Sequence, residues 1–288
     1  MRNIILSSGE VKNRKMIIDQ TYNLLKTDYR EKTEDLTIKD VIIGLHLTAV
    51  RLSDDSFGVA STLTDDHPNC AKESRDYGDF SPSKIKGQRI SYLFETLNGS
   101  SVVFTLKIAV LNAISSGLIS SGKYTVFKNC DPVDLIDLSS RKTITIVGAF
   151  HSYIRKISET NNRLYVLELN KNALYPDEMQ FYIPAVEYPK VFQGSDVVII
   201  TGLTLVNNSI DNLLSAIPQK ARVIVTGPSS SIIPDILFAN NVEIIGATHI
   251  TKPDVLFDIV SEAGAGFHLF RYCAQKICIL KRNEKQGI

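Results

Sequence analysis

The second half of the chain alternates between short apolar runs and amphipathic stretches. The apolar runs are almost unbroken, which is typical of parallel strands that are buried on both faces of a sheet. They cover residues 143–147, 164–169, 196–200, 222–226, 242–245 and 276–280. The stretches between them have helical patterns and cover residues 153–159, 186–193, 209–217, 233–240 and 253–263. This alternation predicts an α/β fold with a Rossmann-like parallel sheet and helices on both of its faces.

The first half has a different pattern. A loosely amphipathic stretch at 11–25 predicts a helix. Two β-rich runs, 40–52 and 57–63, stand on either side of a polar turn and predict a hairpin. After a long polar loop, the pattern predicts a helix at 90–97 and a second helix that begins after Ser100 or Ser101 as its N-cap. These elements predict a smaller α+β domain with a sheet of about three strands.

The change of pattern near residue 140 predicts two domains, 1–140 and 141–288. The length of 288 residues agrees with this division, because a domain has about 150 residues as a rough average.

The charges are balanced in the whole chain and in each half. There are 32 Lys and Arg against 31 Asp and Glu, so the net charge is +1, and the two halves carry about +1 and 0. Neither half has the basic excess of a dedicated nucleic-acid binder, so no nucleic-acid partner is expected. The longest unbroken apolar runs, such as 197–200, are short against the roughly 20 residues of a membrane span, so no membrane partner is expected either.

Four cysteines are too few for a disulfide framework in a chain of this length. No signal peptide is apparent at the first residues. Together these features predict a reduced, cytoplasmic protein. Cys273 and Cys278 are expected in the core, and no partner is evident for Cys130.

Small and polar residues follow the predicted parallel strands. Ligands bind outside the carboxyl ends of such strands, where glycine allows close approach of the backbone and helix N-termini attract anions. The candidate ligand-binding residues at these ends are Gly148, Thr201, Gly202, Thr204, Asn207, Gly227, Pro228 and Ser229. Any one of the glycines is explained by the need for a turn. Two polar loops at adjacent strand ends favour a site for an anionic small molecule.

Glu168 lies 20 residues after Gly148, the spacing at which a dinucleotide site places an acidic residue against ribose hydroxyls. The glycine-rich fingerprint itself is missing, because Phe150 and Tyr153 stand where glycines are needed. A phosphate-binding P-loop motif is also missing. Ordinary NAD or nucleoside-triphosphate binding is therefore not expected.

Three residues are candidate metal ligands. His67 and Cys70 form an H-x-x-C pair in the long loop, although two ligands do not complete a tetrahedral site and a solvated loop explains them as well. His151 follows a predicted strand and could face the ligand as a metal ligand or as an acid or base. His46 is expected in the middle of a strand. No nucleophile-elbow motif is present.

Several runs resemble a family described for heavy-metal chelation, the domains of unknown function numbered 364 and 4213. The runs are 194–211, 225–229 and 245–247, with weaker likeness at 143–150 and 111–113. The resemblance implies an enolase N-terminal-like domain followed by a Rossmann-like domain, with a site between them that handles a metal or a metal chelate. It carries the same strand-end residues, from Thr201 to Ser229, together with Glu168. It also places Cys70 where the family often has cysteine.

Three functions remain open at this point. The resemblance favours a protein that binds a heavy metal or metal chelate in an interdomain cleft, with a transition metal as the implied cofactor. The residue chemistry alone favours an enzyme that binds a nucleotide-like or other anionic small molecule at the strand ends. The third is a non-catalytic partner-binding protein. The sequence leaves the metal, the reaction and the oligomeric state open.

Overall fold

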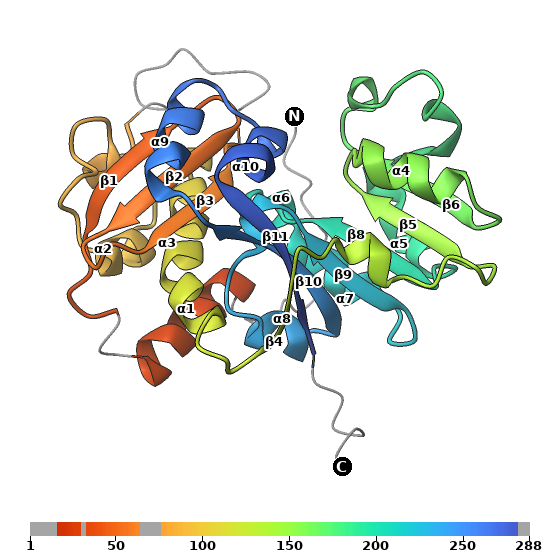
Figure 1. Ribbon diagram of the computed structural model, residues 1–288, viewed down its shortest axis with the longest axis horizontal. Helices are drawn as coiled ribbons and strands as arrows, with labels where there is room; N and C mark the ends of the chain where they lie inside the picture. Colours follow the sequence, from red (N-terminus) through yellow and green to blue (C-terminus); the bar gives the residue numbers. More distant parts are fainter. Residues whose placement is uncertain (1–15, 30–32, 64–75, 282–288) are drawn as a thin grey trace, which may run out of the picture.

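The computed structural model describes residues 16–29, 33–63 and 76–281, and it contains two sheets (Figure 1). The smaller sheet is antiparallel, in the order β1-β2-β3. The larger has eight strands in the order β4-β11-β10-β9-β8-β5-β6-β7 and is mostly parallel. Helices flank it on both faces, so the predicted fold class is confirmed.

The small sheet and its helices come from the first half of the chain. The elements are α1 (Ile17–Asp28), β1 (Ile38–Ile43), β2 (Leu47–Leu52), β3 (Phe57–Ser61), α2 (Ile90–Glu95) and α3 (Ser101–Ile119). The helix at 101–119 begins as predicted, because the Ser100 hydroxyl accepts the N–H of Val103 at 3.3 Å. The start of the predicted first helix, residues 11–15, lies outside the described residues.

The run at 40–52 was expected to be one strand, and this was wrong. It forms two antiparallel strands, β1 and β2, joined by a tight turn in which the N–H of Gly44 donates to the carbonyl of Leu47 at 2.9 Å. His46 therefore lies exposed in this turn and not in mid-strand. The β-rich pattern does not show where the chain reverses, because only Gly44 among the turn residues Gly44, Leu45 and His46 is a common turn former.

Helix α3 is the central helix of the small sheet. By length and composition it could cross a bilayer, and it is the single such helix within the part of the chain that the structure describes. However, 78% of its apolar window is buried inside the protein. Its apolar surface packs against β2 and β3 and against the loops of the larger sheet, so α3 is a core helix here.

The larger sheet is built by the second half of the chain, together with one earlier strand. Its strands are β4 (Thr125–Lys128), β5 (Thr143–Val147), β6 (Arg163–Glu168), β7 (Tyr182–Pro184), β8 (Val197–Thr201), β9 (Arg222–Thr226), β10 (Val242–Ile250) and β11 (Ala274–Leu280). Its helices are α4 (His151–Ser158), α5 (Tyr188–Phe192), α6 (Leu203–Val206), α7 (Ile210–Ala216), α8 (Asp235–Ala239), α9 (Pro253–Ser261) and α10 (Gly266–Tyr272).

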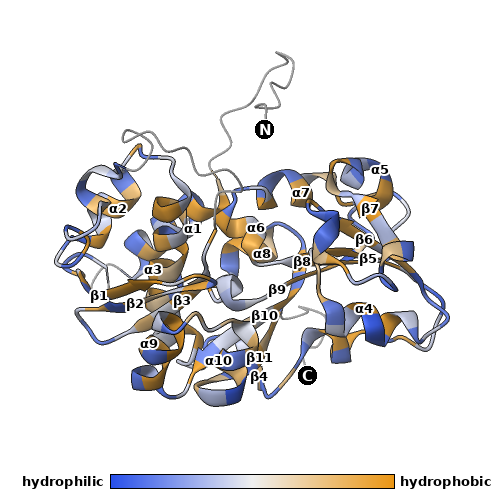
Figure 2. Cartoon of the chain, turned by 90° about the horizontal axis from the view of Figure 1, so that it is seen from above, coloured by the Kyte–Doolittle hydropathy of each residue, from blue (hydrophilic) through white to orange (hydrophobic). Residues whose placement is uncertain are grey.

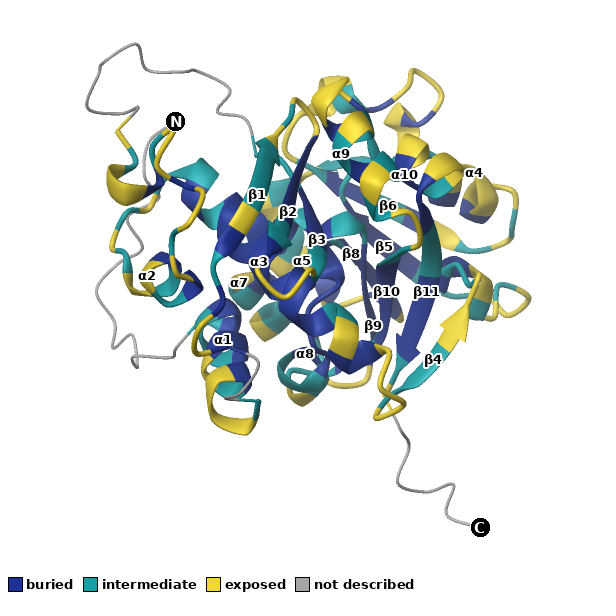
Figure 3. Cartoon of the chain, turned by 60° about the vertical axis from the view of Figure 1, so that its left-hand side comes forward, coloured by how far each residue is buried: buried dark blue, intermediate teal, exposed yellow. Residues whose placement is uncertain are grey.

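The six parallel strands, β5 to β10, have the classic Rossmann order. Numbered along the chain they lie 3-2-1-4-5-6, so the order reverses between β5 and β8. Alternate residues of the central strands are buried on opposite faces. Ile199 packs on the α4 side, and Ile200 packs on the side of α6 and α7. Figure 3 shows these strands buried, with β4 at an exposed edge.

Strand β4 joins the larger sheet although it precedes residue 140. It pairs with β11, which runs antiparallel to β10. The segment before the predicted boundary therefore contributes its last strand to the second sheet. Domains 1–140 and 141–288, and the likeness of the first to an enolase N-terminal domain, stay predictions.

Helices α9 and α10 cross over to the small sheet. Leu256 and Val260 of α9 and Leu269 of α10 pack with Leu47 and Ala49 of β2 in one buried cluster. The small sheet thus lies between α3 on one face and the C-terminal helices on the other (Figure 2). The two halves of the chain share core packing and are not two separate globules.

Candidate functional site

The loops after β5 and β8 meet at the point where the strand order reverses. Gly148 has φ +106, and a Cβ there would lie 3.1 Å from Cγ2 of Thr201. Glycine is required because the backbone is left-handed and the Thr201 side chain lies against it. The structure brings these two residues into contact, and their role as ligand contacts stays a prediction. Because the Thr201 side chain lies against Gly148, no space remains between these two residues.

The loop after β9 lies beside the loop after β8. The N–H of Gly202 donates to the carbonyl of Thr226 at 2.7 Å, and Gly227 has φ +130. Ser229 is fully buried, and its hydroxyl accepts the N–H of Ser61 at 2.8 Å. The carbonyl of Pro228 accepts from the Asn112 amide at 3.2 Å. This loop therefore ties the larger sheet to the small one.

The remaining polar candidates close local turns. The Thr204 hydroxyl donates to the carbonyl of Thr201 at 2.7 Å. The Asn207 side-chain oxygen accepts from the N–H and hydroxyl of Ser209 at 3.1 and 2.6 Å. The Glu168 carboxylate accepts the N–H groups of the next two residues. As ligand contacts, these residues stay predictions.

His151 is held by a buried carboxylate. Its Nδ1 lies 2.8 Å from a carboxylate oxygen of Glu178, and its ring stacks on Tyr175 with centroids 4.1 Å apart. An imidazole oriented this way presents Nε2 as a possible donor atom. His67 and Cys70 lie outside the described residues. Among the residues that are described, no three His, Cys, Asp or Glu side chains come together in a way that could hold a metal.

A pocket of about 580 Å³ lies at the carboxyl ends of β5 and β9, beside the middle of β10, and we call it the strand-end pocket. Its lining includes the start of α4, the Thr226–Pro228 loop, the middle of β10, and much of α10. The first turn of α4 has no side-chain N-cap. Of the predicted ligand residues, Gly227 and Pro228 line this pocket.

Two cations line the strand-end pocket, and no carboxylate is among the lining residues. The Lys276 ammonium lies 2.5 Å from a carboxylate oxygen of Asp131, behind the lining, and 5.4 Å from the ring centroid of Phe270. Arg271 is exposed, with its guanidinium 5.8 Å from the ring centroid of Phe267, and it has no ion pair with any described residue.

Tyr153 forms part of the pocket wall and is almost fully buried. Its hydroxyl donates to the Asp131 carboxylate, the same group that pairs with Lys276. Burial, followed by the hydrogen bond to Asp131, raises the pKa of Tyr153, so this phenol stays protonated at neutral pH. Asp131 therefore holds two residues of the pocket in place.

The sequence did not indicate Arg271, Lys276 or the aromatic residues around them. They come from α10 and from the antiparallel strand β11, whereas the strand-end rule draws attention to the residues after parallel strands. The available signal was the stretch 266–272, which carries two phenylalanines and one arginine between glycine and the last strand.

The order of the parallel strands defines a Rossmann-like α/β protein, with a cationic pocket at the strand ends. The model of DUF364, whose description proposes heavy-metal chelation, matches residues 131–279, just over half of the chain. That of DUF4213, with the same description, matches residues 27–115. The chain belongs to the DUF364 family, so the predicted resemblance is confirmed.

Relatives confirm the fold over nearly the whole chain. A DUF364 protein of unknown function from Pyrococcus horikoshii has a TM-score of 0.74 at 21% identity, covering 92% of this chain and all of that one. A second, from Desulfitobacterium hafniense, has a TM-score of 0.65 at 15% identity, covering 90% and 99%. An uncharacterized protein of Methanocaldococcus jannaschii is 24% identical over 84% of this chain and 87% of its own.

Proposed function

We propose that the protein binds a metal in the form of a negatively charged organic chelate, and that the strand-end pocket is the site. The observation that carries this proposal is the lining of the pocket by Arg271 and Lys276 with no lining carboxylate. We infer the metal from the family description. We infer its bound form, a negatively charged chelate, from the positive charge of the pocket.

The pocket suits an organic anion in size and in chemistry. Its volume of about 580 Å³ is within the range of roughly 300–1,000 Å³ for small-molecule sites. An arginine fork can bind a carboxylate through two parallel hydrogen bonds, and Lys276 offers a point charge held by Asp131. Phe150, Phe267 and Phe270 supply apolar surface for the carbon skeleton.

The donor set of the described residues fits a chelate better than a bare ion. A bare transition metal needs several nitrogen, sulfur or carboxylate ligands in one place. The structure describes no such group, whereas a chelator brings its own ligands. His151 is not among the lining residues, and its ring is held against Glu178 and Tyr175, so its role as a metal ligand stays a prediction. The site proposed here is therefore at the strand ends, although the resemblance implied a cleft between domains.

Binding of nickel citrate to the tag-free protein tests this proposal. Isothermal titration would compare nickel citrate with nickel chloride and with citrate alone. We expect saturable binding that is strongest for nickel citrate and that weakens at least tenfold in Arg271→Ala, because one charge-assisted contact is worth roughly 1.5–3 kcal/mol. Lys190→Ala, an exposed cation on α5, is the matched control and should bind as the wild type does.

Two results would count against the chelate. Equal affinity for nickel chloride and nickel citrate, unchanged in Arg271→Ala, would favour direct metal binding. Stronger binding of citrate alone would favour the second hypothesis, a protein that acts on an organic anion without a metal. That hypothesis rests on the same cationic lining, and the titration separates the two.

A further inference from the structure

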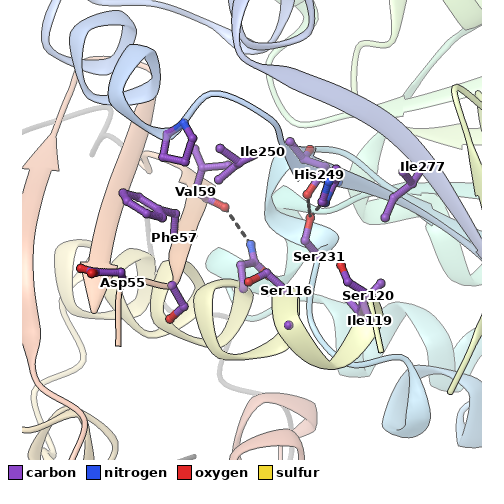
Figure 4. A pocket seen from close by; sticks show the side chains of 16 residues that line it. Asp55, Phe57, Val59, Ser116, Ile119, Ser120, Ser231, His249, Ile250 and Ile277 are labelled. Atoms are coloured by element: carbon purple, nitrogen blue, oxygen red, sulfur yellow. Dashed lines mark hydrogen bonds between the residues drawn. The ribbon is translucent and has the colours of Figure 1, made fainter. Parts of the chain in front are cut away.

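A second, smaller pocket lies between the two sheets. It has a volume of about 210 Å³, and we call it the inter-sheet pocket. Its walls come from the start of β3, the second half of α3, and the C-terminal part of β10 with the residues that follow it. Figure 4 shows Phe57 and Val59 on one side, Ser231 and His249 on the other, and Ser116 of α3 between them.

Asn112 of α3 lines this pocket with half of its amide unused. Its side chain is 2% exposed, and its Nδ2 donates to the carbonyls of Val59 at 2.7 Å and Pro228 at 3.2 Å. These two bonds fix the orientation of the amide, because a flip would place its oxygen against two carbonyls. Oδ1 is buried and has no hydrogen-bond partner among the described residues. A ligand at Oδ1 must therefore bring a donor.

Thr248 of β10 also lines this pocket, but its hydroxyl lies on the other face of the strand. Thr248 is paired across the sheet with Lys276, on the face where Gly246 borders the strand-end pocket. Its backbone N–H donates to Ser231 Oγ at 2.9 Å. Buried polar groups in native proteins are nearly always paired, so the unpaired Asn112 Oδ1 beside this cavity indicates a ligand that pairs with it.

The charges around the pocket do not favour a strongly anionic ligand. Asp55 is its one lining carboxylate, and that group is already bound by Lys39 and Arg51 at 2.9 and 2.8 Å. No lysine or arginine lines the pocket. The groups that remain are hydroxyls, one amide oxygen and the His249 ring, all of which suit a partner that both donates and accepts.

We infer that the inter-sheet pocket is a separate binding site for a small uncharged polyol. A hydroxyl group can donate to Asn112 Oδ1 while another pairs with the ring of His249, and the C–H face of a polyol can lie on Phe57. The volume equals that of about seven water molecules at roughly 30 Å³ each, which is close to the size of a pentose. This inference does not depend on the chelate site.

Saturation-transfer NMR with D-ribose tests the inference. We expect a saturable signal from the wild type that weakens at least tenfold in Ser116→Leu, which fills the pocket from α3. The Ser116 hydroxyl bonds to its own helix, at the carbonyl of Ala113, so Ser116→Leu should keep the melting temperature. Thr248→Val removes a hydroxyl on the other face of β10 and should retain the full ribose signal.

A second variant removes a polar contact without filling the pocket. His249→Phe keeps a ring on the wall and removes its nitrogen atoms, so it should weaken the ribose signal and keep the melting temperature. No ribose signal from the wild type, or a signal unchanged in both Ser116→Leu and His249→Phe, would overturn the inference.

Discussion

The two pockets share a wall and differ in chemistry. Thr248 and Ile277, on neighbouring strands of the larger sheet, line both of them. On one side the lining includes Arg271 and Lys276 with aromatic rings, and on the other it includes hydroxyls and an amide with no cation. The sheet forms the wall that the two pockets share, and the helices packed on it give each pocket its different chemistry.

The largest expected effect comes from a pair of glycines, one in each pocket. A Cβ at Gly58, in the inter-sheet pocket, would lie 2.0 Å from the backbone oxygen of Ala109 and 2.5 Å from the backbone nitrogen of Ala113. The helix backbone cannot yield, so we expect Gly58→Ala to lower the free energy of unfolding by about 3 kcal/mol. Urea unfolding measures it.

The matched glycine of the strand-end pocket should be more tolerant. A Cβ at Gly246 would lie 2.2 Å from Thr226 Oγ1 and 2.4 Å from Pro132 Cγ, which are side-chain atoms. We expect Gly246→Ala to cost about 1–2 kcal/mol, since these side chains can shift. If Gly246→Ala proves the more damaging of the two, the contrast between a rigid and a yielding neighbour is wrong.

The next effect separates a structural role of Ser229 from the ligand-binding role that the sequence predicted. Ser229→Ala leaves the partly buried N–H of Ser61 without its acceptor, so the free energy of unfolding should fall by about 1–2 kcal/mol. Binding of nickel citrate should not change. A variant that unfolds like the wild type but binds tenfold more weakly would instead show that Ser229 contacts the ligand.

The smallest effect concerns two buried thiols. Cys278 lies next to Lys276 on β11, and Cys273 packs in the cluster behind the small sheet. Burial raises the pKa of both thiols, and contact with Cys130 raises the pKa of Cys278 further. Above the unfolded thiol pKa of about 8.5, the unfolded chain loses protons that the folded chain keeps, so stability is full below that pH and falls as pH rises.

Urea unfolding between pH 7.5 and 10 checks this slope. Each thiol contributes at most about 1.4 kcal/mol per pH unit, so Cys278→Ala should flatten the decline and Cys273→Ala should flatten it less. A decline of the same steepness in both variants would assign it to other groups. Comparing the two variants shows whether ionisation of Cys278 in the larger sheet or of Cys273 behind the small sheet contributes more to the loss of stability.

The strand ends were predictable because the sequences of buried parallel strands are unbroken runs of apolar residues. Arg222–Thr226 and Thr143–Val147 have the predicted bounds. The runs after them are short and punctuated by glycine, which is a local signal. The division of 40–52 and the helix at Gly266–Tyr272 were missed, because their patterns are too short or too uniformly apolar to be distinguished locally.

By itself the sequence determined the class of fold, the family and the edge of the sheet at which the parallel strands end, since these depend on periodicity and on residues close together in the chain. The tertiary structure decided which side chains face that edge. It turned Ser229 towards Ser61, brought Arg271 and Lys276 beside the Thr226–Pro228 loop, and packed α9 against a sheet some 200 residues earlier in the chain. Contacts between residues so far apart in the chain depend on which elements cover each apolar face, and a local sequence pattern does not show this.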